Sequence, residues 1–347
     1  MLIKGAGAGV ERCGWAYAVI QVGAGGMNVR LFRMAVLVLG VLGLVAGLPV
    51  LRPASALAAE VVRIDTLSPT RSAVFIESPA MRQVVQVQLL HPAGDGARPS
   101  YYLLDGLDPG VGQSTWTNAT EAERFFLGKN VNVVLPVGGK ASYFTNWQRD
   151  DPALGHYQWE TFLTQELPPL IDSKFSGNGV NAIGGLSMGG HAAYILAARH
   201  PALYTAVAGY SACPDTGMAT GAVQFSILTR GGNPDNMWGP GGGPEWAAHN
   251  PALMLDRLRG KTLYLSTGTG LPGPHELEPK PQLPENIVLG GPIEFAVDTC
   301  VIAFERRARA AGLPIRVDYS PVGTHSWSYW NDHLKASWPT VGTAIGG

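Results

Sequence analysis

A serine set between glycines is the residue of this chain best placed to do chemistry. The segment Gly185-Leu186-Ser187-Met188-Gly189 follows residues 180–184, which have the pattern of a short buried strand, and precedes a helix predicted over 190–200. Strand, Gly-x-Ser-x-Gly and helix, in that order, form a nucleophile elbow, a tight turn in which glycines let the serine project. The pattern predicts a nucleophilic Ser187; the alternative is a glycine-rich turn holding an ordinary serine.

A serine hydroxyl is a weak nucleophile, so it needs a base, and the base needs a carboxylate to orient it. After a nucleophile elbow, the chain order is serine, acid, histidine. His325 lies between the last predicted strand and the last predicted helix, where this arrangement places its base. His275 lies in a proline-rich loop, and we expect solvent around His333. The sequence therefore favours His325, against the alternative of a loop histidine that caps the helix.

The acid has four candidates. Glu276 and Glu278 follow a strand predicted over 262–266, whereas Glu294 and Asp298 begin the next helix, one turn apart. Pattern alone does not choose among them.

Two backbone N–H groups are candidates for an oxyanion hole, which stabilises the charge that develops on an attacked carbonyl. One belongs to Met188, directly after the nucleophile. The second should come from a loop after an early strand, and Leu107 in Asp105-Gly106-Leu107 fits that place.

Strands and helices alternate along the chain that must position these residues. Alternation predicts a mostly parallel sheet with helices on both faces, and an elbow on a middle strand makes this an α/β-hydrolase fold. The Gly/Pro-rich segment 214–251 is predicted to cover the site. The predicted strands are 61–65, 73–78, 83–90, 100–104, 131–136, 180–184, 206–210, 262–266 and 315–320, and the predicted helices are 121–127, 159–175 (interrupted near Pro168), 190–200, 292–311 and 327–338.

Composition excludes some functions. The 347 residues hold 25 basic and 26 acidic side chains, a net charge of −1, so the basic excess of a nucleic-acid-binding protein is missing. We see neither a glycine-rich phosphate loop nor a cluster with metal-ligand spacing. No metal and no other cofactor is expected.

The beginning of the chain has the features of an export signal. Arg30 and Arg33 precede the uncharged apolar stretch 34–50, and Ala56-Leu57-Ala58 has the small-x-small pattern of a cleavage site. We therefore expect an N-terminal extension and signal peptide over 1–58, with Met27 as an alternative start, and a single catalytic domain over 59–347. An uncleaved N-terminal anchor is the alternative; after cleavage no stable membrane span is expected.

Two cysteines remain in the expected exported domain, Cys213 and Cys300. An even pair in an exported protein predicts a disulfide, and the alternative is two buried free thiols.

Several motifs together resemble one family, the antigen 85 mycolyltransferases, with the corynebacterial-type members most similar. The resemblance spans nearly the whole domain. Its motifs are Tyr102-Leu103-Leu104-Asp105-Gly106-Leu107, Leu135-Pro136-Val137-Gly138-Gly139, Trp159-Glu160-Thr161-Phe162-Leu163-Thr164, Gly185-Leu186-Ser187-Met188, Met237-Trp238-Gly239-Pro240 and Gly323-Thr324-His325-Ser326-Trp327.

The resemblance implies a secreted cell-envelope enzyme without cofactor. Family members move a mycolyl chain from trehalose monomycolate to a second trehalose monomycolate or to cell-wall arabinogalactan. It maps the nucleophile to Ser187, the base to His325 and the acid to Glu294, ahead of Asp298 and Glu276. It also implies that Asp105 and Trp327 bind trehalose.

Two departures from the family pattern stand out. Asp108 occupies the position of an arginine that contacts sugar in mycobacterial members, which leaves the acceptor sugar open, and residues 148–158 lack the family's Cys-x₄-Cys disulfide. Three alternatives remain: a diacylglycerol acyltransferase, a secreted carboxylesterase or lipase-like hydrolase, and a non-catalytic fibronectin-binding adhesin.

Overall fold

A computed structural model describes residues 58–347 except 95, 278 and 280. Residues 1–57 of the predicted export segment 1–58, and Glu278, lie outside the described residues.

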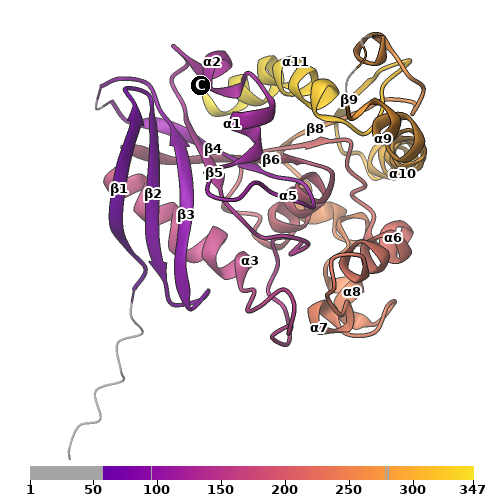
Figure 1. The fold of residues 1–347 in the computed structure, drawn as a ribbon, viewed down its shortest axis with the longest axis horizontal. Coiled ribbons are helices and arrows are strands. Elements are labelled where there is room, and N and C mark those ends of the chain that lie inside the picture. Colours follow the sequence, from indigo (N-terminus) through magenta and orange to yellow (C-terminus); the bar gives the residue numbers. More distant parts are fainter. Residues whose placement is uncertain (1–57, 95, 278, 280) are drawn as a thin grey trace, which may run out of the picture. The chain divides into compact units, whose positions relative to one another are not determined.

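A nine-stranded sheet is the centre of the described domain (Figure 1), with the strand order β1-β2-β3-β5-β4-β6-β7-β8-β9. The strands from β1 to β3 and the pair β3–β5 run antiparallel, and all the pairs from β5 to β9 run parallel. The α/β-hydrolase prediction is confirmed. The strands are β1 (Glu60–Ser68), β2 (Arg71–Ser78), β3 (Gln83–Leu90), β4 (Arg98–Leu104), β5 (Asn132–Pro136), β6 (Gly177–Leu186), β7 (Ala206–Tyr210), β8 (Thr262–Thr267) and β9 (Ile315–Tyr319).

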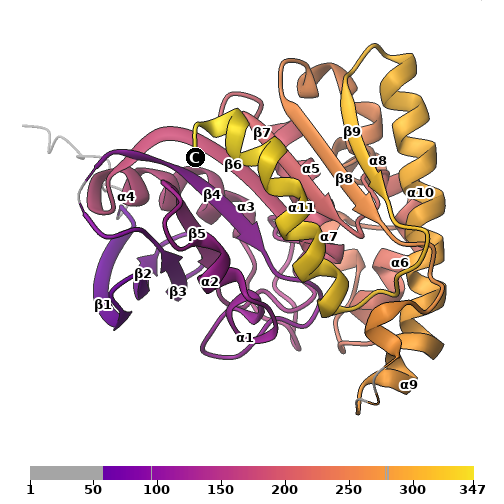
Figure 2. The ribbon, with the colours of Figure 1, turned by 90° about the horizontal axis from the view of Figure 1, so that it is seen from above.

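Helices cover both faces of the parallel strands, which is why every residue of β4, β5 and β7 is buried. One face packs on α3 (Trp159–Thr161), α4 (Leu167–Lys174), α5 (Ser187–Arg199) and α10 (Gly291–Ala310). The other packs on α1 (Thr115–Ala119), α2 (Ala122–Phe126) and α11 (Trp327–Ile345), and Figure 2 shows α11 in front of the sheet. A short π-helix, Phe162–Glu166, joins α3 to α4.

The carboxyl ends of the parallel strands bring distant residues to one edge. Ser187 directly follows β6, the segment 105–107 follows β4, and Ser211 follows β7. Thr267 ends β8, and the segment with His325 follows β9. In open parallel sheets, ligands bind beyond the carboxyl ends of strands, so this edge is the place to look for a site.

Segment 214–251 is more regular than its Gly/Pro content suggested. It contains α6 (Thr216–Leu228), α7 (Asp235–Trp238), α8 (Pro244–Ala248) and the beginning of a 3₁₀ turn, Pro251–Leu253. The side chain of Asp215 caps α6 by accepting from Gly217 N and Met218 N, a signal the sequence carried. The glycines inside α6 lower its intrinsic helix propensity and hid it.

The helix predicted over 159–175 is divided close to the predicted interruption near Pro168: α3 passes into the π-helix Phe162–Glu166, and α4 begins at Leu167 with both prolines in its first turn. The helix predicted over 327–338 was too short, because α11 continues past Trp338, through Pro339, to Ile345.

Within the described residues, the helical stretch Leu283–Ala310 is long and apolar enough to cross a membrane by length and composition alone. It includes α9 (Leu283–Glu285), a π-helix (Asn286–Gly290) and α10. Val301, Phe304 and Ala308 of α10 are buried in the core, whereas Ile293 and Phe295 are exposed, so α10 packs on the domain along one side.

Candidate active site

The three side chains predicted to form a triad lie in one hydrogen-bonded line. Nε2 of His325 is 2.8 Å from Oγ of Ser187, and its Nδ1 is 2.8 Å from Oε2 of Glu294. The residues are 138 and 31 positions apart in the chain, so the fold, not local sequence, brings them together. The geometry suits a base that takes the serine proton while a carboxylate fixes its tautomer.

The backbone at Ser187 is strained in the way an elbow requires. Ser187 has φ +50°, in the left-handed region that side chains other than glycine rarely adopt. A Cβ on Gly185 would lie 2.6 Å from the carbonyl carbon of Gly189. The two glycines therefore allow β6 and α5 to approach closely enough for the turn to close.

Glu294 is buried at the N-terminal end of α10, with 1% of its surface exposed. Its Oε1 accepts from Ser211 Oγ at 2.7 Å, Gly268 N at 2.8 Å and Thr267 Oγ1 at 3.2 Å. Burial pushes the pKa of Glu294 upward, but the hydrogen bond and charge of His325, together with the Gly268 and Ser211 donors, outweigh it. The pKa of the carboxyl is therefore below its ordinary value.

The other described acid candidates have different surroundings. Asp298 is half-buried one turn further along α10, where burial and the charge of Glu294 raise its pKa. Glu276 accepts hydrogen bonds from Gly273 N, Thr324 Oγ1 and Tyr329 Oη, and none of these partners is an imidazole. Of the described candidates, Glu294 is the one hydrogen-bonded to His325.

Ser211, Thr267 and Gly268 were not singled out from the sequence. Their common signal is position, since each lies at the carboxyl end of β7 or β8. Ser211 also has φ +47°, and a non-glycine residue in that region indicates a functional constraint. No residue-type motif marks them.

The predicted oxyanion donors lie where two backbone segments meet. A Cβ on Gly189 would collide with the carbonyl oxygens of Leu104 (2.8 Å) and Asp105, so the beginning of α5 packs directly on the chain leaving β4. Met188 is the second residue of that helix. Leu107 lies in the loop after β4, where Ala141 N donates to Leu107 O at 3.0 Å. The amides of both residues therefore belong to the edge that holds Ser187.

Asp105 is fully buried beneath α1, where its Oδ2 accepts from Ser114 Oγ and Thr115 N, both at 3.1 Å. Burial raises its pKa to about 7 against the Thr115 and Ser114 hydrogen bonds. Its Oδ1 is buried without a hydrogen-bond partner in the described structure.

Trp327 is half-buried at the beginning of α11 and is linked to the triad by aromatic rings. Its ring meets those of Trp116 (5.5 Å) and Trp330 (5.2 Å) edge to face. Trp330 in turn lies edge to face with the His325 imidazole at 4.9 Å. Trp330 thus packs on the His325 ring while both ring nitrogens stay hydrogen-bonded, Nδ1 to Glu294 and Nε2 to Ser187.

Asp108, the departure from the family pattern, is paired with an arginine from another part of the chain. Arg230, just after α6, contacts both carboxylate oxygens of Asp108, with Nε 3.2 Å from Oδ2. The ion pair joins the end of α6 to the residue after Leu107.

The structure joins Cys213 and Cys300 in a disulfide with a Cα–Cα distance of 5.4 Å. Cys213 lies two residues after Ser211, and Cys300 lies on α10 six residues after Glu294. The bond therefore fastens the loop after β7 to the helix that carries the candidate acid.

Loop 148–158, which lacks the family disulfide, is closed by Asp151. This residue pairs with Gly155 through two backbone hydrogen bonds, and its Oδ2 accepts from Asn233 N and Asn236 Nδ2.

His333, expected in solvent, is buried with 6% of its surface exposed. The expectation was wrong because His333 lies on the face of α11 turned to the sheet, next to the core residue Leu334. Burial lowers its pKa.

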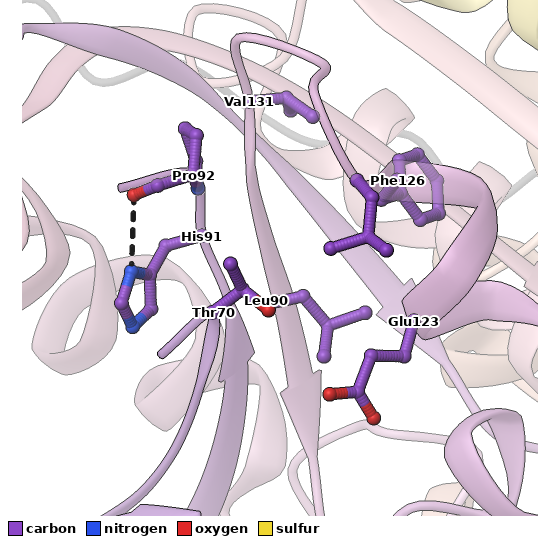
Figure 3. Close-up of a pocket in the computed structure, with 8 residues that line it drawn as sticks. Thr70, Leu90, His91, Pro92, Glu123, Phe126 and Val131 are labelled. Atoms are coloured by element: carbon purple, nitrogen blue, oxygen red, sulfur yellow. Dashed lines mark hydrogen bonds between the residues drawn. The ribbon is translucent and has the colours of Figure 1, made fainter. Parts of the chain in front are cut away.

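A small pocket lies elsewhere, between the end of β3, α2 and Val131, and is lined by Leu90, His91, Glu123 and Phe126 among others (Figure 3). Its volume of about 10 Å³ is at the lower limit for one water molecule. None of its lining residues belongs to the triad.

Comparison with known proteins shows the family to which the chain belongs. Residues 78–341 match the family described as putative esterase. The chain is 31% identical over 293 residues to diacylglycerol acyltransferase/mycolyltransferase Ag85B of Mycobacterium intracellulare, covering 78% of this chain and 83% of the relative. It is 32% identical over 295 residues to the protein of that name from Mycobacterium avium, covering 79% and 84%.

Among solved structures, the crystal structure of Mycobacterium tuberculosis MPT51 (FbpC1) superimposes with a TM-score of 0.65 at 25% identity, covering 77% of this chain and 96% of that one. Fold, family model and relatives together define a serine-esterase-like acyltransferase. The chain belongs to the antigen 85 mycolyltransferase family.

Proposed function

We propose that the protein is a secreted acyltransferase that moves a mycolyl chain from trehalose monomycolate to a second trehalose monomycolate, or to cell-wall arabinogalactan, through an acyl-enzyme on Ser187. The observation that carries the proposal is the unbroken hydrogen-bonded line from Ser187 through His325 to the buried Glu294. The names of the relatives indicate the acyl group.

In the first half-reaction, Nε2 of His325 takes the Ser187 proton as Oγ attacks the ester carbonyl of the donor. The Met188 and Leu107 amides stabilise the oxyanion that forms, a contribution of about 10²–10³ in rate per donor in comparable sites. The bond to the trehalose oxygen breaks, and His325 returns the proton to that oxygen. Free trehalose leaves, and the mycolyl group remains as an ester of Ser187.

In the second half-reaction, His325 takes a proton from an acceptor sugar hydroxyl, whose oxygen attacks the mycolyl-serine ester. Ser187 leaves and regains its proton from His325. The ionised Glu294 stabilises the imidazolium in both halves, in keeping with its lowered pKa. Transfer prevails over hydrolysis when the acceptor hydroxyl is held in place and water is kept out.

The substrate-binding roles belong to the same proposal. Trp327, which is half-buried, would contact trehalose. Asp105, for which the resemblance implied the same contact, has no exposed surface in the described structure and so does not reach a bound sugar in this arrangement. The segment 214–251 would cover the acyl chain: α6 exposes Met218, Phe225 and Leu228, each with more than half of its surface accessible. Exposed apolar side chains on a helix joined to the site by the Asp108–Arg230 pair suit a lipid chain.

The test is to incubate the purified protein with trehalose monomycolate and to identify the lipid products by mass spectrometry. Trehalose dimycolate and free trehalose are expected, together with a mycolyl adduct on the peptide that contains Ser187. Ser187→Ala should form neither adduct nor product and should not react with a fluorophosphonate probe. Labelling that persists in Ser187→Ala would reject Ser187 as the nucleophile.

The product ratio separates the alternatives. Free mycolic acid as the main product, with acceptor sugar present, would indicate a carboxylesterase, and acylated diacylglycerol would indicate a diacylglycerol acyltransferase. A protein that gives no product but retains fibronectin in a pulldown, in the wild type and in Ser187→Ala alike, would be an adhesin.

A further inference from the structure

A second buried carboxylate lies beside the loop that carries the candidate base. Glu276 ends the 3₁₀ turn Pro274–Glu276, which follows β8, and 8% of its surface is exposed. Its Oε1 accepts from Thr324 Oγ1 at 2.9 Å. Its Oε2 accepts from Tyr329 Oη at 2.6 Å and from Gly273 N at 2.8 Å.

The two hydroxyl donors lie on either side of His325. Thr324 immediately precedes the histidine and is fully buried, and Tyr329 lies four residues after it, in the first turns of α11. One carboxylate therefore ties together both sides of the segment from which the imidazole projects. These three donors are neutral groups, so the contact fixes geometry through directional hydrogen bonds.

The same two segments are joined again by backbone bonds. Gly270 N donates to Gly323 O, and Gly323 N donates to Leu271 O, both at 2.8 Å. A Cβ on Gly268 would lie 2.7 Å from Gly323 O. The chain after β8 thus supports the His325 loop along its length, from the Gly268 that donates to Glu294 to the Glu276 that holds Thr324.

We propose that Glu276 is a positioning residue for His325: through Thr324 and Tyr329 it holds the loop backbone so that the imidazole reaches Glu294 and Ser187 together. The inference rests on the proposed roles of Ser187 and His325. Errors of about 1 Å in such placement cost about 10² in rate. Because Glu276 contacts the His325 loop through Thr324 and Tyr329, its loss should lower kcat and leave KM nearly unchanged.

The test compares isosteric variants. Thr324→Val removes the hydroxyl and keeps the shape, and Thr324→Ser restores the hydroxyl. We expect Thr324→Val to lower kcat for a p-nitrophenyl ester, and the rate of fluorophosphonate labelling, by about 10- to 100-fold, with KM within about twofold. Thr324→Ser should recover to within about threefold of the wild type. Tyr329→Phe and Glu276→Gln should lower kcat in the same way, and all rates are measured well below each variant's Tm.

Glu160→Gln is the matched control, because Glu160 is also a buried carboxylate but bonds to residues away from the His325 loop. It should lower Tm without lowering kcat of the folded protein. The inference is overturned if Thr324→Val and Tyr329→Phe both keep kcat within twofold, or if Thr324→Ser is as slow as Thr324→Val. Should Thr324→Val not fold, Tyr329→Phe decides. Labelling that persists in Ser187→Ala would instead defeat the proposed function itself, so the two failures are distinguishable.

Discussion

Two buried carboxylates in this protein accept hydrogen bonds from histidines, yet their surroundings differ. Glu294 bonds one imidazole, His325, and otherwise only neutral donors. Glu160, in α3, accepts on one oxygen from Arg199 Nε at 2.8 Å and lies 2.7 Å from His200 Nε2. Its other oxygen is 3.9 Å from His249 Nε2.

The difference lies in what the imidazoles can do next. The far nitrogen of His325 meets the Ser187 hydroxyl. The far nitrogen of His249 meets the backbone carbonyl of Glu245, and its ring stacks on Trp238 at 4.5 Å. Near Glu160, the Arg199 guanidinium balances the charge of the carboxylate. The His249 ring is held by the Glu245 carbonyl and by Trp238, and neither of these is a nucleophile. A carboxylate–imidazole pair thus becomes a candidate for catalysis only when its open end faces a nucleophile.

The largest effect on activity is expected for Glu294→Gln. The amide keeps the shape but no longer holds the imidazole in the right tautomer or stabilises the imidazolium, so kcat should fall by about 10³–10⁴. Ester turnover and circular dichroism measured on the same sample check it. A loss of less than tenfold in a folded variant would mean that Glu294 is not the acid.

Glu160→Gln should act on stability instead. Removing one partner of a buried ion pair leaves the rest uncompensated, at a cost of about 3 kcal/mol. Urea unfolding measures the loss, and active-site titration should show that the folded fraction keeps its kcat. If kcat falls as far as in Glu294→Gln, the two carboxylates are not functionally distinct.

The disulfide should affect Glu294 and not Glu160, since it anchors α10, which carries Glu294, and makes no bond to α3, which carries Glu160. The double variant Cys213→Ser with Cys300→Ser should lose about 2 kcal/mol of stability, because the unfolded chain is no longer constrained. Its fluorophosphonate labelling should slow by a few fold as α10 loosens. The expected stability loss is contradicted if the wild type, measured with and without reductant, unfolds at the same urea concentration.

Lowering the pH should reduce the stabilisation that Glu160 and Glu294 give to the folded protein. Burial raises the pKa of Glu160, but the His200, His249 and Arg199 hydrogen bonds outweigh it, so its pKa, like that of Glu294, is below its ordinary value. A lowered folded-state pKa gives stability that is present above the unfolded value, about 4.3, and is lost as pH falls below it. Unfolding free energies at pH 7 and pH 4 should therefore differ less in Glu160→Gln than in the wild type; an equal difference would refute the assignment.

The sequence was informative where chemistry is local. Ser187 is marked by its own neighbours, and His325 by its place between the last strand and helix. Glu294 could not be separated from Asp298 or Glu276 by pattern, because the choice depends on which side chain of α10 points at a loop 31 residues away; the resemblance to the family was needed. Ser211, Thr267 and Gly268 carried no motif, since their role exists only once β7 and β8 are adjacent.

The fold was predicted in outline for a similar reason. Buried strands can be recognised in a sequence as apolar runs, and all nine predicted strands correspond to strands of the sheet. Helix α6 was missed because its glycines obscured the pattern, and the burial of His333 because its helix face depends on packing against the sheet.

The position of β1 has a practical consequence. It is the outermost strand of the sheet, with β2, β3, β5 and β4 between it and β6, whose end carries Ser187. A linker attached just ahead of Ala59 would leave from the margin most remote, in strand order, from the reactive hydroxyl. Immobilising the domain on a bead through that point should therefore leave the edge of the sheet that holds Ser187 accessible to large acceptors.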